Sequence, residues 1–301
     1  MKVRASVRND VHGWVVLDKP AGMTSTHAVS RLKRIFNAKK AGHAGTLDPL
    51  ATGVLAVAFG EATKTVPFVQ DGEKAYRFTV RWGAETDTDD CDGRVAAQSD
   101  ARPAADVILA LLPRFTGTIE QTPPSYSAVK INGDRAYDLA RGGQAPEMFP
   151  RPVTIYALDL INAGRDEAVF EARCGKGTYV RAIARDLGRS LGCYGHVSAL
   201  RRTRVGPFSE ADAVAYIDLA DGMIEARQAL RRVEAGLMEV PRVVVDSSVA
   251  TRLRRGQPVL LRGHDAPFDG FAYAACRGVV IAVGAVEKGA LIPGRVFNLP
   301  F

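Results

Sequence analysis

One segment, residues 42–53, constrains the fold of this chain more than any other, because it places a single carboxylate in a glycine-rich turn. It reads Gly-His-Ala-Gly-Thr-Leu-Asp-Pro-Leu-Ala-Thr-Gly and lies between a basic helix and an apolar strand. Its three glycines allow positive φ angles or close backbone approach, and Asp48-Pro49 is a pair typical of turns. The pattern predicts that Asp48 is rigidly presented. The alternative is a plain type I turn with Pro49 at its second position, the commoner role of an isolated Asp-Pro pair.

The chain carries a moderate positive charge that is concentrated toward its end. Its 301 residues have a formal net charge of +7. Residues 240–301 hold eight Lys and Arg against four Asp and Glu, so this stretch contributes +4. Such an excess suits a polyanionic partner, although it does not require one.

The cysteine spacing favours reduced thiols, and the lengths of the apolar runs favour a protein without a membrane segment. No Cys-x-x-Cys pair occurs, so the sequence indicates neither a zinc site nor a disulfide framework. The four cysteines are scattered: Cys91, Cys174, Cys193 and Cys276. No apolar run approaches the length of a signal peptide or a membrane span. We therefore expect a cytoplasmic protein with no membrane partner.

Hydrophobic periodicity predicts alternating strands and helices, followed by a β-rich end. Strands are expected at residues 14–17, 54–59, 75–82, 153–160, 168–174 and 196–204. Helices are expected at residues 24–36, 103–112 and 179–191, with further helical periodicity over 212–237. A small all-β unit is expected from five short runs, at 243–245, 259–261, 271–273, 279–283 and 295–297.

Two local patterns suggest ligand sites that their spacing does not support. Residues 87–93 are acidic enough for calcium, but Cys91, Asp92 and Gln98 stand where an EF-hand needs an oxygen ligand, Gly and Glu. Residues 175–178, Gly-Lys-Gly-Thr, lack the spacing of a phosphate loop. We therefore expect no metal and no nucleotide cofactor.

Nine motifs in a fixed order and spacing resemble one known family. They lie between about residue 12 and about residue 208, at 17–23, 42–55, 60–64, 74–77, 86–88, 123–130, 177–181, 186–188 and 200–202. In this arrangement the chain resembles the bacterial tRNA pseudouridine synthases of the TruB type, which modify uridine 55 in the T-loop. The resemblance thins after residue 210.

The resemblance implies an α/β (α+β) fold with two domains. Residues 1–239 would form a pseudouridine-synthase catalytic domain, with a mixed, mostly antiparallel sheet flanked by helices. Residues 122–152, rich in Pro, Gly and Tyr, would be an inserted RNA-binding thumb that guide-RNA-dependent relatives lack. Residues 240–301 would form a β-rich, PUA-like RNA-binding module. We expect a monomer that binds the T-arm and elbow of tRNA without a guide RNA.

The implied reaction breaks the C1′–N1 glycosidic bond, turns the uracil and rejoins it through C5. It needs a carboxylate near C1′, a base and a closed pocket, and it requires neither a metal nor an organic cofactor. By resemblance Asp48 is that nucleophilic carboxylate. A cation is needed to keep it ionised beside RNA phosphates, and Arg181 matches the family position for this ion pair. Taken alone, an Arg that opens a helix more often reaches solvent.

The resemblance also assigns residues that would contact the substrate. Tyr76 would stack on the target uracil and is a candidate general base, while Tyr179 and Leu200 would line the uridine pocket. Without the resemblance, both tyrosines would pass as ordinary core aromatics. The uridine must be flipped out of the T-loop, and His43 would insert into the loop to support the flipped stack. A lone loop histidine is more commonly just a surface residue.

Three lysines are further candidates for contacts with RNA phosphates: Lys19, Lys64 and Lys130. A non-catalytic tRNA-binding protein that only helps tRNA fold is the alternative function, and the basic end and the thumb would serve it. A pure binder gains nothing from a carboxylate aimed at a polyanion, whereas the enzyme needs one. Asp48 therefore favours the enzyme.

Overall fold

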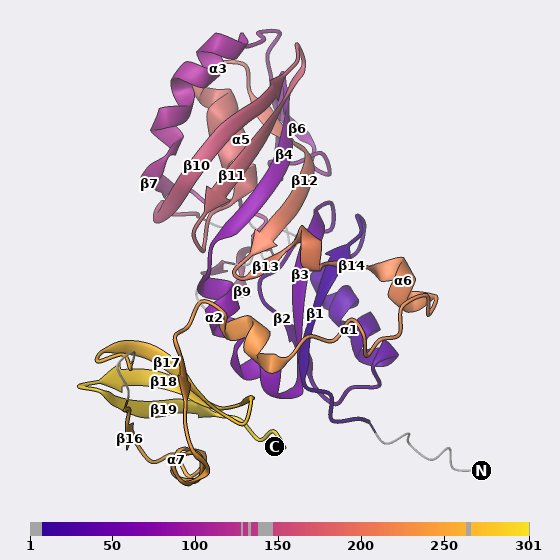
Figure 1. Cartoon of the computed structure of the whole chain (residues 1–301). Helices are drawn as coiled ribbons and strands as arrows, with labels where there is room; N and C mark the ends of the chain where they lie inside the picture. The colour runs from indigo at the N-terminus through magenta and orange to yellow at the C-terminus, as the bar shows by residue number, and fades with distance from the viewer. Residues whose placement is uncertain (1–7, 128, 132–133, 138–146, 263–265, 301) are drawn as a thin grey trace.

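One large mixed sheet and one smaller C-terminal sheet organise the chain (Figure 1). The computed structural model describes residues 8–127, 129–131, 134–137, 147–262 and 266–300. None of the helices in these ranges is long and apolar enough to cross a membrane.

Within the described residues the large sheet has ten strands. These are β1 (Gly13–Lys19), β2 (Ala41–His43), β3 (Thr52–Phe59), β4 (Lys74–Trp82), β7 (Gly117–Gln121), β10 (Arg151–Ala163), β11 (Glu167–Cys174), β12 (Gly195–Val205), β13 (Phe208–Ser209) and β14 (Val214–Ala215). Their order is β14-β1-β3-β12-β4-β11-β10-β7, with β2 paired to β3 and β13 paired to β12. Neighbours are antiparallel except β1 with β14 and β3 with β12. The mixed, mostly antiparallel sheet that the sequence predicts is confirmed.

Helices flank this sheet, as predicted. The helices whose bounds the described residues define in this part of the chain are α1 (Ser25–Ile35), η1 (Gly60–Lys64), α2 (Val66–Asp71), α3 (Ala105–Leu111), η2 (Leu112–Phe115), α5 (Val180–Ser190), η3 (Glu210–Asp212), α6 (Tyr216–Ala220) and η4 (Val233–Leu237), where η marks a 3-10 helix. Figure 1 shows α3 and α5 behind the half of the sheet made by β4, β10 and β11. In α5 the buried residues Ile183, Ala184 and Leu187 follow helical spacing and form its sheet-facing stripe. Two small hairpins lie outside the large sheet: β5 (Ala84–Thr86) with β6 (Val95–Gln98), and β8 (Lys130–Ile131) with β9 (Asp134–Arg135).

The helical stretch expected over residues 212–237 is wrong. The chain there forms only short helices separated by turns. Its apolar residues serve two different cores, because Leu219 packs with the α1 side of the sheet whereas Val233 and Leu237 pack around Trp14. At Gly236 a Cβ atom would lie 2.6 Å from the Trp14 ring nitrogen, so the chain passes against that ring where only glycine fits.

The β-rich end expected from the sequence is present as a separate five-stranded sheet within the described residues. It contains β15 (Arg242–Val244), β16 (Val259–Leu260), β17 (Gly270–Cys276), β18 (Val279–Glu287) and β19 (Ala290–Val296), in the order β15-β17-β18-β19-β16, with α7 (Ser247–Arg254) packed against it. Phe297, which follows β19, is fully buried in the cluster around Trp14. The C-terminal sheet is thus attached to the large one through a shared apolar core.

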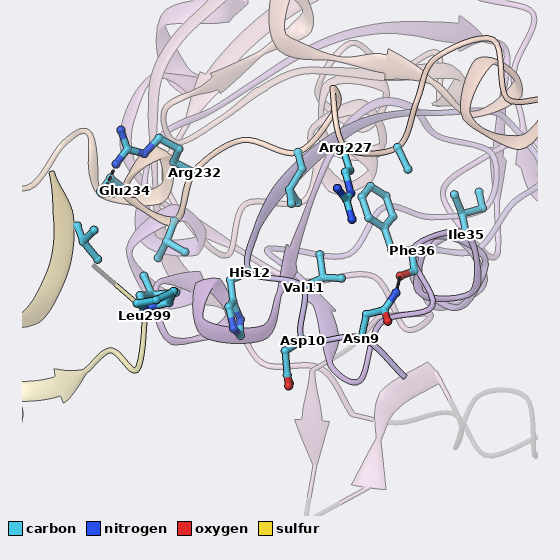
Figure 2. A pocket seen from close by; sticks show the side chains of 15 residues that line it. Asn9, Asp10, Val11, His12, Ile35, Phe36, Arg227, Arg232, Glu234 and Leu299 are labelled. Carbon is cyan, nitrogen blue, oxygen red and sulfur yellow. Dashed lines mark hydrogen bonds and ion pairs between the residues drawn. The ribbon is translucent and has the colours of Figure 1, made fainter. Parts of the chain in front are cut away.

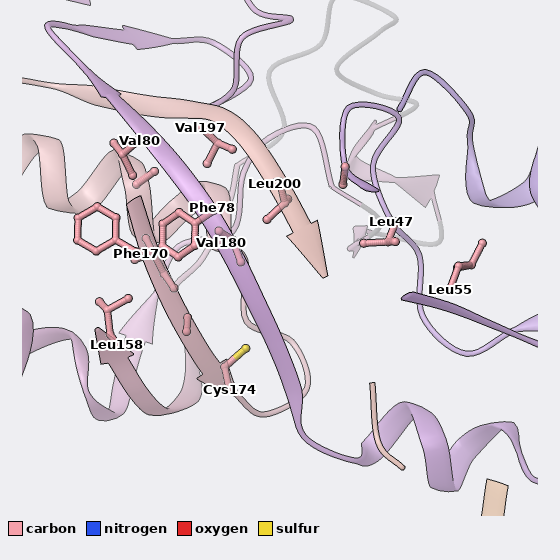
Figure 3. Packing of buried hydrophobic residues seen from close by; sticks show 14 of the residues in the cluster. Leu47, Leu55, Phe78, Val80, Leu158, Phe170, Cys174, Val180, Val197 and Leu200 are labelled. Carbon is pink, nitrogen blue, oxygen red and sulfur yellow. The ribbon is translucent and has the colours of Figure 1, made fainter. Parts of the chain in front are cut away.

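The main core lies between the large sheet and the helices α1 and α5, and Figure 3 shows part of it. Phe78 of β4 stacks on Phe170 of β11 with ring centroids 5.4 Å apart, and Trp82 meets the same Phe170 edge-on. Leu47 and Leu200 extend this cluster toward the Asp48 loop. Packing therefore fixes the position of that loop relative to α5.

A cavity of about 800 Å³ lies at the C-terminal end of α1, away from the Asp48 loop, which contacts the start of that helix (Figure 2). It is formed by the first described residues, the end of α1, residues 226–234 and the chain end near Leu299. The residues that line it include none of those predicted to bind substrate.

Candidate active site

A cavity of about 280 Å³ opens where the Asp48 loop, the end of β12 and the start of α5 meet. Its lining includes five of the predicted site residues: Asp48, Tyr76, Tyr179, Arg181 and Leu200. They come from four segments that are far apart in sequence. The fold therefore brings most of the predicted site together.

The side chain of Ser25, in α1, holds the Asp48 loop on one side. The Ser25 hydroxyl donates to the Leu47 carbonyl at 2.9 Å and accepts from the Leu47 N–H at 2.8 Å. Ser25 opens α1, whose N-cap Thr24 accepts a hydrogen bond from the His27 N–H. The residue before Asp48 is thereby tied to the rigid start of a helix.

Lys19 holds the other side of the loop. Its side chain is fully buried, and its Nζ donates to three backbone carbonyls, those of Met23 (2.7 Å), Pro20 (2.9 Å) and Pro49 (3.3 Å). Burial lowers the pKa of Lys19 to about 8, while the negative charge of Asp48 opposes that shift. The lysine is thus a buried cation behind the loop.

Arg202 is a second buried cation under the same loop. Its guanidinium donates to the carbonyls of Val54 (2.8 Å), Gly45 (3.1 Å) and Thr46 (3.4 Å). Gly53 has a φ of +94°, and a Cβ atom there would lie 2.3 Å from the Arg202 carbonyl oxygen. The close approach of the loop to β12 therefore requires glycine at this position.

Of the other two loop glycines, Gly45 has a positive φ of 100°, as the sequence predicts. Gly42 has no positive φ, and a Cβ there would meet nothing within 4 Å. It lies in β2, which pairs with β3. The strand pairing explains why Gly42 keeps an ordinary conformation.

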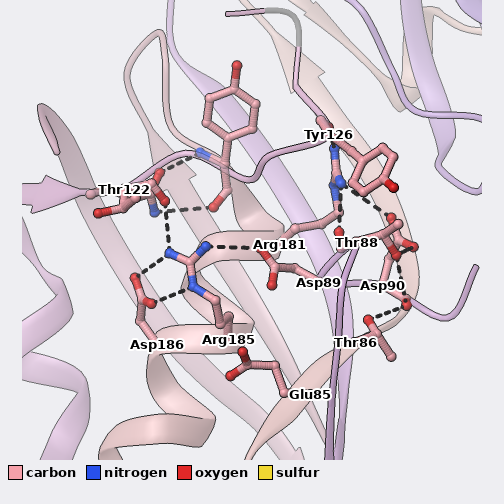
Figure 4. A network of polar contacts seen from close by, with 12 residues as sticks. Glu85, Thr86, Thr88, Asp89, Asp90, Thr122, Tyr126, Arg181, Arg185 and Asp186 are labelled. Atoms are coloured by element: carbon pink, nitrogen blue, oxygen red, sulfur yellow. Dashed lines mark hydrogen bonds and ion pairs between the residues drawn. The ribbon is translucent and has the colours of Figure 1, made fainter. Parts of the chain in front are cut away.

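Arg181 pairs with Asp48 in the wall of the cavity, and Figure 4 shows Arg181 beside Thr88, Asp90 and Tyr126. The Arg181 Nε lies 3.0 Å from the Asp48 Oδ2, and the rest of the guanidinium donates to the carbonyls of Thr88 (2.7 Å) and Tyr126 (2.8 Å). Asp90 lies 3.5 Å from the same guanidinium. The Arg181 side chain is 5 % exposed and the Asp48 side chain 37 %, so the carboxylate is the partner that a substrate can reach.

The acidic stretch at residues 87–93 faces the arginines of α5. Asp90 accepts from the Thr88 hydroxyl at 2.6 Å, and Asp89 pairs with Arg185 at 3.0 Å. Burial raises the pKa of Asp89 to about 6, and the Arg185 charge opposes the shift. The stretch that resembled a calcium loop thus holds α5 in place through ion pairs.

Two tyrosines from different elements line the cavity. Tyr76 belongs to β4 and Tyr179 precedes α5 directly. Burial raises the pKa of both phenols. A raised pKa keeps the Tyr76 phenol protonated at neutral pH, which favours the stacking role predicted for it over the role of a general base.

His43 ends β2 and is half-buried, opposite Val57 of β3. It is not among the residues that line the cavity in the described part of the chain. It therefore lies at the start of the segment 42–53, outside the pocket that the other predicted residues line.

The three lysines predicted to contact RNA phosphates lie in different settings. Lys19 is enclosed by the carbonyls that it binds, so no phosphate can approach it in this structure. Lys64 pairs with Glu61 at 2.7 Å and donates to the Val296 carbonyl at 2.7 Å, which ties η1 to the end of β19. The side chain of Lys130 lies outside the described part of the chain.

Sequence reasoning missed Arg202, Ser25 and Gln121. Arg202 stands in the 200–202 motif, and the only sequence signal for it is a second arginine in a strand end. Gln121 directly precedes the motif at 123–130, and the alternation of β7 would place its side chain on the buried face. Ser25 lies at the start of the helix expected at 24–36, and only the fold shows that its side chain binds Leu47.

The sequence matches two parts of a known family. Residues 33–180 match the TruB family pseudouridylate synthase N-terminal domain, and residues 181–237 match the tRNA pseudouridylate synthase B C-terminal domain. Among curated relatives, the tRNA pseudouridine synthase B proteins of Rhodopseudomonas palustris and Bradyrhizobium diazoefficiens are each 60 % identical over 97 % of this chain, covering 82 % and 87 % of their own lengths. The protein of that name from Mesorhizobium japonicum is 51 % identical over 95 % of this chain and 96 % of its own.

Solved structures share the fold. A chain in a crystal structure of a Cbf5-Nop10-Gar1 complex aligns over 95 % of this chain and 84 % of its own, with a TM-score of 0.72 and 26 % identity. A chain in a structure of an H/ACA RNP bound to a substrate RNA containing 2′-deoxyuridine aligns over 99 % and 92 %, with a TM-score of 0.72 and 23 % identity.

Proposed function

The chain belongs to the TruB family of pseudouridylate synthases, and we propose that it isomerises uridine 55 in the T-loop of tRNA to pseudouridine. The tRNA pseudouridine synthase activity follows from relatives that are 60 % identical over 97 % of the chain. Three points are proposals: the position modified in tRNA, the independence from a guide RNA, and the roles of individual residues.

The observation that carries the residue assignment is the ion pair between Asp48 and Arg181 in the wall of a uridine-sized cavity. A reactive carboxylate needs to be accessible and fixed. The Asp48 side chain is partly exposed, while hydrogen bonds hold the backbone on both sides of it and hold its partner Arg181. This arrangement suits attack on, or stabilisation of, the sugar carbon C1′.

In the proposed mechanism, the flipped uridine enters the cavity with its ribose toward Asp48. The C1′–N1 bond breaks, and Asp48 stabilises or bonds to C1′ while Arg181 keeps the carboxylate in place. The detached uracil turns between Tyr76, Tyr179 and Leu200. A new C5–C1′ bond then forms, the C5 proton is lost and N1 gains a proton, so the overall change is an isomerisation without a redox step.

The substrate is tested with a T-arm stem-loop and whole tRNA transcripts. Because double-stranded and folded RNA is read by shape, we expect the stem-loop to be modified nearly as well as whole tRNA. Mass mapping of the product should place one pseudouridine in the T-loop with purified protein alone. A requirement for the anticodon half, or for an added guide RNA, would contradict the proposal.

We propose that residues 240–301 act as an RNA-binding module beside the catalytic domain at 1–239, and that residues 122–152 form the thumb. The basic excess of the chain end supports this division. The test is the salt dependence of tRNA binding after Arg252 and Arg255, which lie at the end of α7, are changed to Gln. Each lost phosphate contact should reduce the log-log slope by about 0.9 without changing the single-turnover rate at saturating enzyme.

We propose that one chain acts on one tRNA, which light scattering of the complex would measure. The non-catalytic tRNA-folding role remains the weaker candidate, because the cavity presents a carboxylate to a polyanion. An Asp48→Asn variant that binds tRNA but forms no pseudouridine would separate the two activities.

A further inference from the structure

Gln121 joins the root of the thumb to the first residues of α5. It is the last residue of β7 and pairs with Arg151 of β10, so the segment at 122–152 leaves and re-enters the large sheet at this pair. The Gln121 side chain is 2 % exposed. Its Oε1 accepts from the Tyr179 N–H at 2.8 Å, and its Nε2 donates to the Tyr179 carbonyl at 3.2 Å.

This two-point contact falls where α5 lacks a cap of its own. Tyr179 is the N-cap residue of α5, its backbone is extended, and its side chain makes no capping hydrogen bond. A backbone N–H just outside a helix has no intrahelical acceptor. The Gln121 amide supplies an acceptor and a donor at once, which fixes both the position and the orientation of the Tyr179 peptide.

Two arginines of α5 bind the same root of the thumb. The Arg185 guanidinium donates to the Thr122 carbonyl at 2.8 Å, and the Arg181 guanidinium donates to the Tyr126 carbonyl at 2.8 Å. Figure 4 shows both arginines beside this segment. Since Arg181 also lies 3.0 Å from Asp48, a continuous set of short contacts links the thumb root to the carboxylate.

We propose that Gln121 is a positioning residue for the isomerisation, acting through Tyr179. It holds the Tyr179 wall of the cavity against the rigid end of β7, so that the thumb root and the uridine pocket keep one geometry. Gln121 is not one of the described residues that line the cavity, so it would not touch the substrate itself. This inference rests on the proposed function, because Tyr179 matters only if a uridine occupies the cavity.

The test compares two substitutions with a matched control on the same strand. Gln121→Leu removes both bonds to Tyr179. Gln121→Glu keeps the shape and the acceptor for the Tyr179 N–H but sets a carboxylate oxygen against the Tyr179 carbonyl. Glu120→Gln is the control, because Glu120 is exposed on the neighbouring position of β7. Each protein is measured for tRNA affinity, single-turnover rate at saturating enzyme, and melting temperature.

We expect both Gln121 variants to bind tRNA within about threefold of the parent and to lose about 10- to 100-fold in single-turnover rate, since a displacement of about 1 Å at a reacting site can cost 100-fold. The loss should persist at temperatures far below the melting temperature, where all molecules are folded. A purely structural role would lower the melting temperature and leave the rate of the folded molecules unchanged. The Glu120→Gln control should match the parent in all three measurements.

The proposal is overturned if the folded Gln121→Glu protein keeps the parent rate within twofold, or if its whole loss is in tRNA affinity. Gln121→Glu is nearly isosteric, so it decides the question even if Gln121→Leu does not fold. If the parent and Glu120→Gln proteins themselves form no pseudouridine, the proposed function fails and the failure is distinguishable from that of the inference.

Discussion

The loop that carries Asp48 and the helix that carries Arg181 face each other across one cavity, but different chemistry holds them. Under the loop, Lys19 and Arg202 donate to backbone carbonyls. On α5, Arg181 and Arg185 pair with buried carboxylates as well as with carbonyls.

This difference explains how the site keeps buried positive charge beneath Asp48 without pairing it with a second carboxylate. Carbonyl oxygens satisfy the donors of a buried cation but carry no full charge, so the loop keeps a positive field beneath Asp48. The α5 side instead balances each cation with an aspartate, which fixes geometry but adds little net field. The loop therefore supplies electrostatics, and α5 supplies position.

Asp48→Asn is the strongest test, because it removes the one carboxylate that the loop presents to the cavity. We expect the single-turnover rate to fall by at least about 10⁴-fold, as for other groups that form a covalent or charge-stabilising contact. The loop is held through its backbone, so tRNA affinity should stay within a few-fold. Asp166→Asn, which changes an exposed ion-paired carboxylate, is the control. Pseudouridine formation above background in the Asp48 variant would refute the assignment.

Arg181→Met should have the next largest effect, a loss of about several hundred-fold in single-turnover rate. The variant also leaves Asp90 buried without its cation, which costs roughly 3–5 kcal/mol of stability, whereas Asp48→Asn leaves no such charge. Thermal melts should therefore separate the two variants. In the double mutant we expect no further loss beyond Asp48→Asn, and simply additive losses would mean that the two residues do not act as a pair.

Arg202→Lys tests whether the loop depends on the shape of its buried cation. Lysine keeps the charge but cannot span the carbonyls of Val54, Gly45 and Thr46 from one rigid fork. We expect a loss of about tenfold in single-turnover rate with unchanged tRNA affinity. Arg204→Lys, at an exposed arginine on the same strand, is the matched control. A parent-like rate for Arg202→Lys would show that charge alone holds the loop.

Much of this site was predictable because turns, strands and helices are determined largely by residues close together in the sequence. The glycine pattern of residues 42–53 predicted a constrained turn, and Gly53 does take a positive φ where β12 passes close by. The strands and the helix that opens at residue 180 followed from hydrophobic periodicity. The assignments of Asp48 and Arg181 as partners came from the family resemblance, and the spacing of one motif alone could not have paired them.

The rest depended on contacts between distant segments. Lys19 resembled a surface cation beside a loop, yet its Nζ is enclosed because Pro49 folds back onto it from 30 residues away. Lys64 binds a carbonyl 232 residues further along the chain. The periodicity at 212–237 failed because its apolar residues divide between two cores. No sequence window contains such partners.

Asp89→Asn should have the smallest effect on catalysis, within about threefold, because Asp89 pairs with Arg185 and does not line the cavity. The variant instead tests, through protein stability, what the ion pair between Asp89 and Arg185 contributes.

The pKa of Asp89 is about 6 in the folded chain, against an ordinary value of 3.8, because burial disfavours its charged form. Between these two values the folded state keeps a proton that the unfolded state has released, so this group stabilises the fold most below about pH 4, and its contribution is lost as the pH rises to about 6. Asparagine does not titrate, so the free energy of unfolding of the parent minus that of Asp89→Asn should fall between pH 4 and pH 7, by at most about 3 kcal/mol. Denaturant titrations at four or five pH values measure this difference. A difference that rises with pH instead would mean that the pairing with Arg185 outweighs burial, and that the carboxylates paired with the arginines of α5 supply attraction as well as position.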